Sequence, residues 1–237
     1  MKTILYKSNT RGHINHGWLN TWHSFSFGHY YDLERTNFGA LRVLNDDIVK
    51  GGAGFPSHPH DNMEIVTIPL YGALEHKDST GGHGVINQYD VQVMSAGSGI
   101  YHSEFNHNAH EDVNLLQIWV FPKEKNIIPR YDQKTFLPEE RINKLQTVVA
   151  PDDVNALWVN QNTWFSLGNF SKGFAETTYH FHSKDNGVYA FVIEGDVIIN
   201  DIELNKRDAV GIYEADTISI KANSRAEILL IEVPMTF

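Results

Sequence analysis

The feature that most constrains this chain is a succession of short apolar segments separated by turn residues. Ten segments rich in Val, Ile, Leu, Phe and Tyr have the length and composition of strands, and Gly, Asn or Asp bounds most of them. An α/β protein would need long segments of 3.6-residue periodicity, and the sequence offers only one short helical turn at Pro138. The sequence therefore predicts an all-β fold with strands at 39–44, 64–70, 73–77, 91–95, 114–121, 188–194, 197–200, 209–213, 217–221 and 227–233.

A weak internal repeat divides the chain into two similar halves. The turn at 71–74 (YGAL) aligns with 194–197 (EGDV), and the strand at 115–120 (LLQIWV) aligns with 228–233 (ILLIEV). We expect two tandem antiparallel β-barrels of the jelly-roll type, residues 1–135 and 140–237. A terminal strand of one barrel is free to pair with the other.

Charge and cysteine content exclude several function classes. The 237 residues include 19 basic and 29 acidic side chains, which gives a formal net charge of −10 and opposes direct nucleic-acid binding. The chain has no cysteine, so thiol nucleophiles, disulfides and cysteine-held clusters are excluded. The apolar run near the N-terminus is too short for a signal peptide, and no stretch approaches the roughly 18 apolar residues of a membrane span. A cytoplasmic protein without membrane contact is expected.

Two pairs of side chains that commonly ligate metals are the strongest chemical signal. In an extended backbone, residues i and i+2 point to the same face, so His58 with His60 and His102 with Glu104 can each present two donors to one ion. Pro59 cannot donate a ladder hydrogen bond, which predicts an edge strand or the start of a strand. Three imidazoles and a carboxylate suit iron, copper, nickel, manganese or zinc, whereas magnesium and calcium prefer oxygen ligands.

These segments carry a family resemblance. The spacings Gly52-(x5)-His58-x-His60-(x3)-Glu64 and Gly97-x-Gly99-x-x-His102-(x3)-Asn106 resemble the paired motifs of the cupin superfamily. Residues 11–27, the HPH segment and residues 94–104 resemble the pirin family, and within it the bacterial pirin-like quercetinases. The resemblance implies a bicupin with one mononuclear metal site in the N-terminal barrel. It implies one divalent transition metal, iron first, with Mn, Ni, Cu, Co or Zn as alternatives, held by His58, His60, His102 and Glu104.

The carboxylate ligand is the one position with two candidates. Glu64 stands where many cupins place a carboxylate ligand, whereas the pirin pattern uses Glu104. Spacing cannot choose between them. We favour Glu104 because the turn at Asp61-Asn62 interrupts the strand phase before Glu64, which is otherwise expected to orient an imidazole N–H.

The resemblance also implies an activity. We expect a metal-dependent dioxygenase that opens the central ring of a flavonol such as quercetin and releases carbon monoxide, with Glu104 as both ligand and catalytic base. The partners would be a small planar aromatic substrate and dioxygen. The first alternative is a regulatory protein of the pirin type that binds protein partners according to its redox state, and the second is a cupin isomerase acting on a sugar. Flat apolar pocket walls would favour the flavonol.

The second half retains only part of the metal pattern. His180 and His182 match the first H-x-H motif, but Ile220 and Ala222 stand opposite His102 and Glu104 in the repeat alignment. We therefore expect a metal-free, structural second barrel filled by Phe191, Ile193, Ile198, Ile212 and Ile231. Among the remaining histidines, those near the N-terminal aromatic residues are expected to pack on the core. The others, at 76, 83, 107 and 110, are expected to be solvated.

Overall fold

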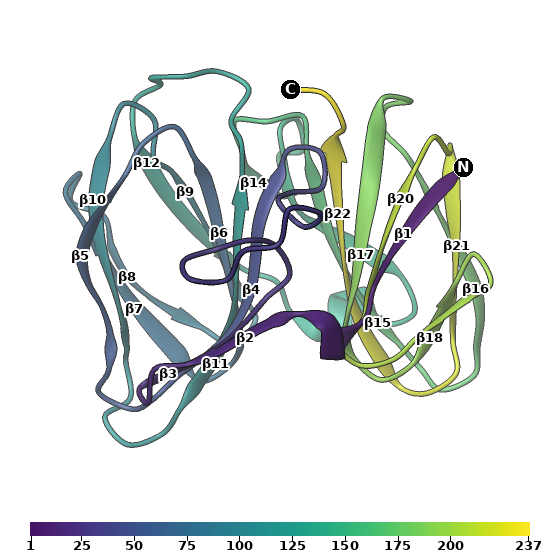
Figure 1. The fold of residues 1–237 in the computed structure, drawn as a ribbon, viewed down its shortest axis with the longest axis horizontal. Helices are drawn as coiled ribbons and strands as arrows, with labels where there is room; N and C mark the ends of the chain where they lie inside the picture. The colour runs from purple at the N-terminus through teal and green to yellow at the C-terminus, as the bar shows by residue number, and fades with distance from the viewer.

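The computed structural model describes residues 1–237 and confirms the predicted all-β fold. Four sheets form two barrels side by side, and in each barrel a seven-stranded sheet faces a four-stranded one (Figure 1). The two large sheets face each other across the middle of the molecule. Helix is confined to two 3-10 turns, η1 (Ser8–Thr10) and η2 (Pro138–Arg141), the second at the predicted proline. No helix has the length and apolar character required to cross a membrane.

The first barrel is antiparallel throughout. Its large sheet has the strand order β12 (Arg130–Thr135), β9 (Asp90–Ser95), β6 (Glu64–Tyr71), β11 (Val113–Val120), β4 (Leu41–Val49), β3 (Leu19–His23) and β2 (Gly12–Asn15). Its small sheet has the order β5 (Gly54–His60), β10 (Ile100–Asn106), β7 (Ala73–Asp78) and β8 (His83–Asn87). The strand that contains Pro59 lies at the edge of the small sheet, as the proline predicts.

The second barrel repeats this plan with one strand borrowed from the N-terminus. Its large sheet has the order β1 (Lys2–Tyr6), β20 (Ala209–Tyr213), β17 (Asn186–Glu194), β22 (Ala226–Pro234), β15 (Trp164–Phe170), β13 (Leu145–Ala150) and β14 (Leu157–Trp158). Its small sheet has the order β16 (Phe174–His180), β21 (Thr217–Ala222), β18 (Val197–Ile199) and β19 (Ile202–Leu204). Among its paired strands, only β13 and β14 run parallel, over two residues.

Strand β1 departs from the expected division at residues 1–135. It pairs with β20 along its whole length, so the first strand of the chain lies in the second barrel (Figure 1). The chain then passes through η1 and enters the first barrel at β2. Tyr6, the last residue of β1, is buried against Phe25 and Tyr189, so both barrels contact the crossing segment.

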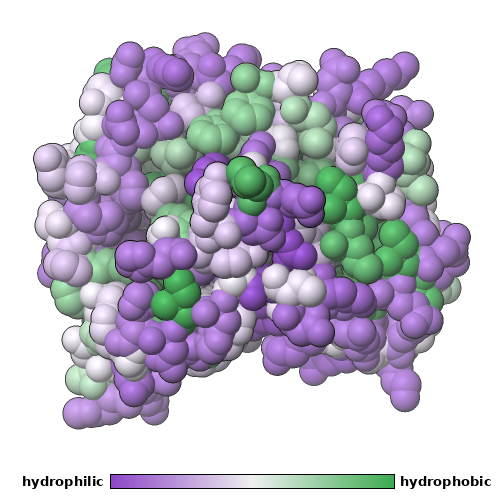
Figure 2. Space-filling model, in the orientation of Figure 1, coloured by the Kyte–Doolittle hydropathy of each residue, from purple (hydrophilic) through white to green (hydrophobic).

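The largest apolar core lies between the barrels. It contains 27 buried residues, including Leu44 and Ile118 of the first barrel and Phe165 and Leu229 of the second. Over the face seen in Figure 2, hydrophilic side chains predominate and hydrophobic ones form separate patches. The apolar side chains that join the barrels are therefore enclosed between them.

The predicted filling of the second barrel was largely wrong. Phe191, Ile193 and Ile231 belong to the core between the barrels, and Ile198 is only half-buried, which leaves Ile212 inside. Strands β17 and β22 are buried on both faces, so their apolar runs show no alternation from which the inward face could be read. An error of one residue in the predicted strand register assigns every side chain to the opposite face of the sheet.

The interiors of the two barrels differ in polarity. The second barrel holds one cluster of 16 buried apolar residues. The first barrel holds two small clusters, of six and four residues, and between the sheets it also buries His76, His102, Glu104 and Gln117. Buried polar groups are stable only when partners satisfy them, so this difference locates the candidate functional site in the first barrel.

Candidate metal centre

Strands β5 and β10 bring the two predicted motifs together. In their antiparallel register His58 lies opposite His102, and His60 lies opposite Ile100. The backbones approach closely at Gly54, where a Cβ atom would lie 2.4 Å from the carbonyl oxygen of Glu104. Only glycine fits there without displacing β10.

A β-bulge shapes the same strand. The register shifts between His102 and Glu104, so Glu104 pairs with Phe55 rather than with Pro56. The extra residue in β5 changes its side-chain phase, and Phe55 contributes to the same cavity wall as His58 and His60. The period-two rule alone would have placed Phe55 on the opposite face.

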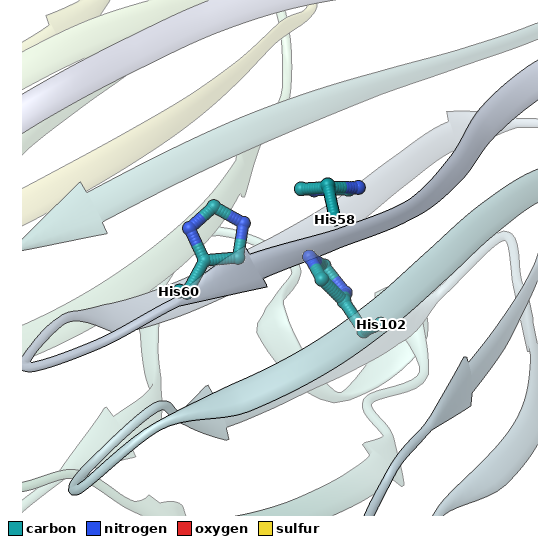
Figure 3. A group of neighbouring side chains, drawn as sticks. All are labelled: His58, His60 and His102. Carbon is teal, nitrogen blue, oxygen red and sulfur yellow. The ribbon is translucent and has the colours of Figure 1, made fainter.

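The three predicted histidines converge on one point. Their ring centroids are separated by 4.9 Å between His58 and His60, 4.4 Å between His58 and His102, and 4.8 Å between His60 and His102. One ring nitrogen from each lies within 4.8 Å of the other two. Figure 3 shows two rings rising from one strand toward the third on its neighbour. Three imidazoles at these separations are able to bind one ion from one side.

The protonation of the rings suits metal binding. The Nδ1 atom of His58 donates to the carbonyl oxygen of Pro56 at 2.8 Å, so its Nε2 atom is the one left to face an ion. The Nε2 atom of His102 is buried and has no hydrogen-bond partner. Burial, followed by the nearby His58, lowers the pKa of His60 to about 4 and that of His102 to about 2. Two neutral imidazoles, His60 and His102, the second with an unpartnered Nε2 in the interior, fit a bound transition metal.

Glu104 is buried to the same extent as His102. Its carboxylate belongs to a second group, in which oxygen and ring nitrogen atoms of His76, His102 and Glu104 lie within 4.8 Å of one another. Its Oε2 atom accepts a hydrogen bond of 2.9 Å from the Nε2 of Gln117, and its Oε1 atom lies 3.5 Å from the hydroxyl of Thr67. Burial raises the pKa of Glu104 above its ordinary value. Its role as a ligand stays a prediction.

The alternative carboxylate, Glu64, faces away from the imidazoles. Its Oε2 atom accepts hydrogen bonds from the hydroxyl of Ser95 at 2.7 Å and from the backbone N–H of Asn160 at 3.1 Å. Asn62, in the turn before β6, has a φ of 47°, and the strand phase changes at that turn. Glu64 therefore joins the two barrels, and the expectation that it orients an imidazole was wrong.

Sequence reasoning missed His76. It was expected to be solvated, but it lies on β7 with no exposed surface, and its ring is 5.3 Å from that of His102. The polar neighbours Glu75 and Lys77 suggested an exposed strand. Its position in the strand could have indicated burial. His76 follows the buried Leu74 by two residues, so both side chains lie on the same face of β7.

The histidine pair of the second barrel does not form a comparable cluster. The Nδ1 atom of His182 lies 2.8 Å from Glu232, and its ring stacks on Trp164 at 4.2 Å, whereas His180 is exposed. The repeat alignment had the wrong register. The residue opposite His180 is Thr217, and Ile220 pairs with Thr177. A threonine thus stands where the first barrel has His102.

Tandem barrels with three imidazoles gathered inside one of them define a bicupin with a candidate metal centre in its N-terminal half. Residues 6–120 match the family described as Pirin, and residues 147–233 match the Quercetinase C-terminal cupin domain. The chain belongs to the pirin family.

Similar proteins span nearly the whole chain. Quercetin 2,3-dioxygenase of Escherichia coli K12 is 41% identical over 231 residues, which cover 97% of this chain and 98% of that protein. A pirin-like protein of Caulobacter vibrioides is 40% identical, covering 93% and 95% of the two chains. The crystal structure of the bacterial pirin YhhW from E. coli, in complex with nickel(II), superposes with a TM-score of 0.92 at 39% identity, covering 98% and 99%. The resemblance inferred from the sequence is confirmed.

Proposed function

We propose that this protein is a metal-dependent dioxygenase that opens the central ring of a flavonol such as quercetin and releases carbon monoxide. The observation that carries the proposal is a cavity of about 360 Å³ beside the imidazoles, within the range of roughly 300–1,000 Å³ common for small-molecule sites. His58, His60 and Glu104 contribute to its wall. The relatives named quercetin 2,3-dioxygenase support the same reaction class.

The cavity lining suits a flat, hydroxylated aromatic molecule. Phe27, Phe55 and Trp119 supply aromatic surface, and Trp119 packs edge-on to His60 with ring centroids 4.8 Å apart. Asn45 and Gln117 supply hydrogen-bonding groups to the same cavity. Aromatic surface favours the flavonol over the sugar alternative, and the polar groups match the hydroxyls of the flavonol.

His58, His60 and His102, with Glu104, would hold the metal. A bound divalent transition metal supplies Lewis acidity toward a substrate oxygen and access to dioxygen chemistry. The lone pairs of His60 and His102 are already available, because burial keeps both rings neutral and the Nε2 of His102 has no other partner. The identity of the metal bound in the cell, iron or one of its alternatives, is part of this proposal.

Glu104 would act on the proton of the reacting hydroxyl. Its raised pKa makes it a better proton acceptor than an exposed carboxylate. Gln117 fixes the Oε2 atom by a short hydrogen bond, whereas the Oε1 atom has only the long contact to Thr67. Oε1 is therefore the atom assigned to take the proton and to return it to the product.

The regulatory alternative stays a prediction, because no partner surface supports it.

One assay decides between turnover and binding. Protein stripped of metal and reloaded with Fe, Mn, Ni, Cu, Co or Zn in turn is mixed with quercetin under air and under nitrogen. Loss of the flavonol absorbance, with oxygen consumption and carbon monoxide release only under air and only with metal, supports the proposal. Absence of turnover with every metal, or turnover under nitrogen, contradicts it.

A further inference from the structure

The buried histidine on β7 completes a chain of contacts that leads to the metal centre. Strand β7 lies beside β10 and pairs His76 with Glu104 and Asp78 with His102. The Nε2 atom of His76 lies 3.0 Å from Oδ2 of Asp78, and its Nδ1 atom lies 3.5 Å from Nδ1 of His102. Its ring also stacks on Tyr131, with centroids 4.5 Å apart and planes inclined by 24°. The imidazole of His76 is therefore fixed in both position and orientation.

Asp78 determines the direction of the first hydrogen bond. Its Oδ1 atom accepts from the backbone N–H and hydroxyl of Thr80, at 2.8 and 2.6 Å, and from the backbone N–H of Gly82 at 3.0 Å. Its other oxygen remains for His76. Burial alone would raise the pKa of Asp78, but hydrogen bonds from Thr80 and His76 hold it below its ordinary value. An ionised carboxylate only accepts hydrogen bonds, so the Nε2 of His76 must carry a proton.

The proton on the Nε2 of His76 determines where the other ring protons in this chain of contacts lie. With the Nε2 of His76 donating to Asp78, its other ring nitrogen, Nδ1, is the acceptor, and it faces the Nδ1 atom of His102. His102 then donates from Nδ1, and its lone pair is at Nε2, the buried atom without a partner. We propose that Asp78 and His76 form a hydrogen-bond relay that fixes the tautomer of His102 and directs its Nε2 lone pair toward the metal. This inference rests on the proposed metal-binding role of His102, and it is independent of the substrate.

His76 acts in this scheme as a positioning residue. It also belongs to a group with His102 and Glu104 that could by itself hold an ion. However, its Nε2 atom is engaged by Asp78 and its Nδ1 atom faces His102, so neither nitrogen is free to coordinate. A direct ligand role is the rival outcome of the test.

The variant Asp78→Asn reverses the relay with little change in shape. The three donors at Oδ1 keep the amide oxygen in that place, so the amide NH₂ faces His76. The Nε2 of His76 must then accept, its Nδ1 donates, and His102 becomes protonated at Nε2, the position needed by the metal. Nitrogen-15 NMR of histidine-labelled, metal-free protein reads this tautomer directly. We expect protonated Nδ1 in the wild type and protonated Nε2 in the variant.

Metal affinity provides the second readout. Competition with a chelator for nickel(II) should show a 10- to 100-fold loss of affinity in Asp78→Asn, the usual effect of removing a group that orients a ligand. His76→Phe retains the ring on Tyr131 but loses the acceptor, and it should lose affinity similarly. His76→Asn retains an oxygen acceptor near Nδ1 and should recover most of the affinity. His83→Phe, on the exposed part of β8, is the control.

The outcomes separate the relay from the proposed function. Protonated Nε2 in wild-type His102, or an unchanged tautomer in Asp78→Asn, overturns the relay even if quercetin is consumed. Failure of quercetin turnover, with the expected tautomers and affinities, contradicts the proposed reaction and leaves the relay intact. Loss of one nitrogen ligand from the nickel X-ray absorption spectrum of His76→Phe would make His76 a ligand and also overturn the relay.

Discussion

At the scale of single residues, the centre depends on atoms that are buried but unsatisfied. A buried polar atom without a partner costs on the order of 1–3 kcal/mol, and the Nε2 of His102 is such an atom beside two further imidazoles. Binding of a metal would remove this cost. The free-energy cost of bringing the three imidazoles together is therefore already met by folding. This favours selective metal binding over the weak, unselective binding of ions by surface histidines.

Glu104→Gln tests the catalytic base. The amide oxygen can still accept the hydrogen bond from Gln117, but the side chain no longer accepts a proton, so turnover should fall by roughly 10²–10⁴. Steady-state rates at matched metal content measure this. Glu64→Gln is the matched control, because it is a buried glutamate of the same barrel outside the cavity. Equal rates in Glu104→Gln and wild type would remove Glu104 from this role.

The sequence made the three histidines predictable for a simple reason. Two i, i+2 pairs on adjacent strands need only the period-two rule to share a face, and the register that joins β5 with β10 supplies the rest. His76 needed more information. The strand face it shares with Leu74 indicates burial, but its contacts with His102 and Tyr131 come from strands later in the chain, and no local pattern records them.

At the scale of strands, register accounts for the largest errors of sequence reasoning. The positions of the main strands follow from composition, but the inward faces of β17 and β22 do not, because both faces are buried. The bulge in β5 likewise changes the phase of Phe55. Side-chain direction in such strands is determined by the partner sheet. A single strand therefore carries too little information to predict it.

The second barrel should bind no metal. His182 is engaged by Glu232 and Trp164, and Thr217 occupies the place opposite His180. Elemental analysis should give one metal equivalent per chain in both the wild type and the double variant His180→Ala/His182→Ala. His58→Ala is the positive control for loss. Two equivalents in the wild type, falling to one in the double variant, would show a second site.

At the scale of the whole molecule, the two barrels are coupled by a buried carboxylate as well as by the apolar core. Glu64 of the first barrel accepts a hydrogen bond from the backbone of Asn160 in the second. Burial raises the pKa of Glu64 to about 7, whereas a glutamate in the unfolded chain has a value near 4.5. The folded protein thus binds a proton more tightly at this position than the unfolded chain does.

The pH dependence of stability follows from this difference. The stabilisation is fully present below pH 4.5 and is lost as the pH rises to about 7, on the order of 3 kcal/mol in all. Urea unfolding of wild type and Glu64→Gln from pH 4 to 9 isolates the effect of this residue. The free energy of unfolding of the wild type, relative to the variant, should decrease between pH 4.5 and 7 and then stay constant. A difference independent of pH would contradict the assignment.

The pairing of β1 with β20 has a consequence for biosynthesis. The strand at residues 2–6 leaves the ribosome about 200 residues before its partner at 209–213. At 5–20 residues per second, the nascent chain carries an unpaired strand for roughly 10–40 seconds. During that interval the first barrel can close around its histidines, but the second cannot complete its sheet. Final closure therefore waits until β20 has been synthesised, and until then both β1 and the interface between the barrels are exposed to aggregation.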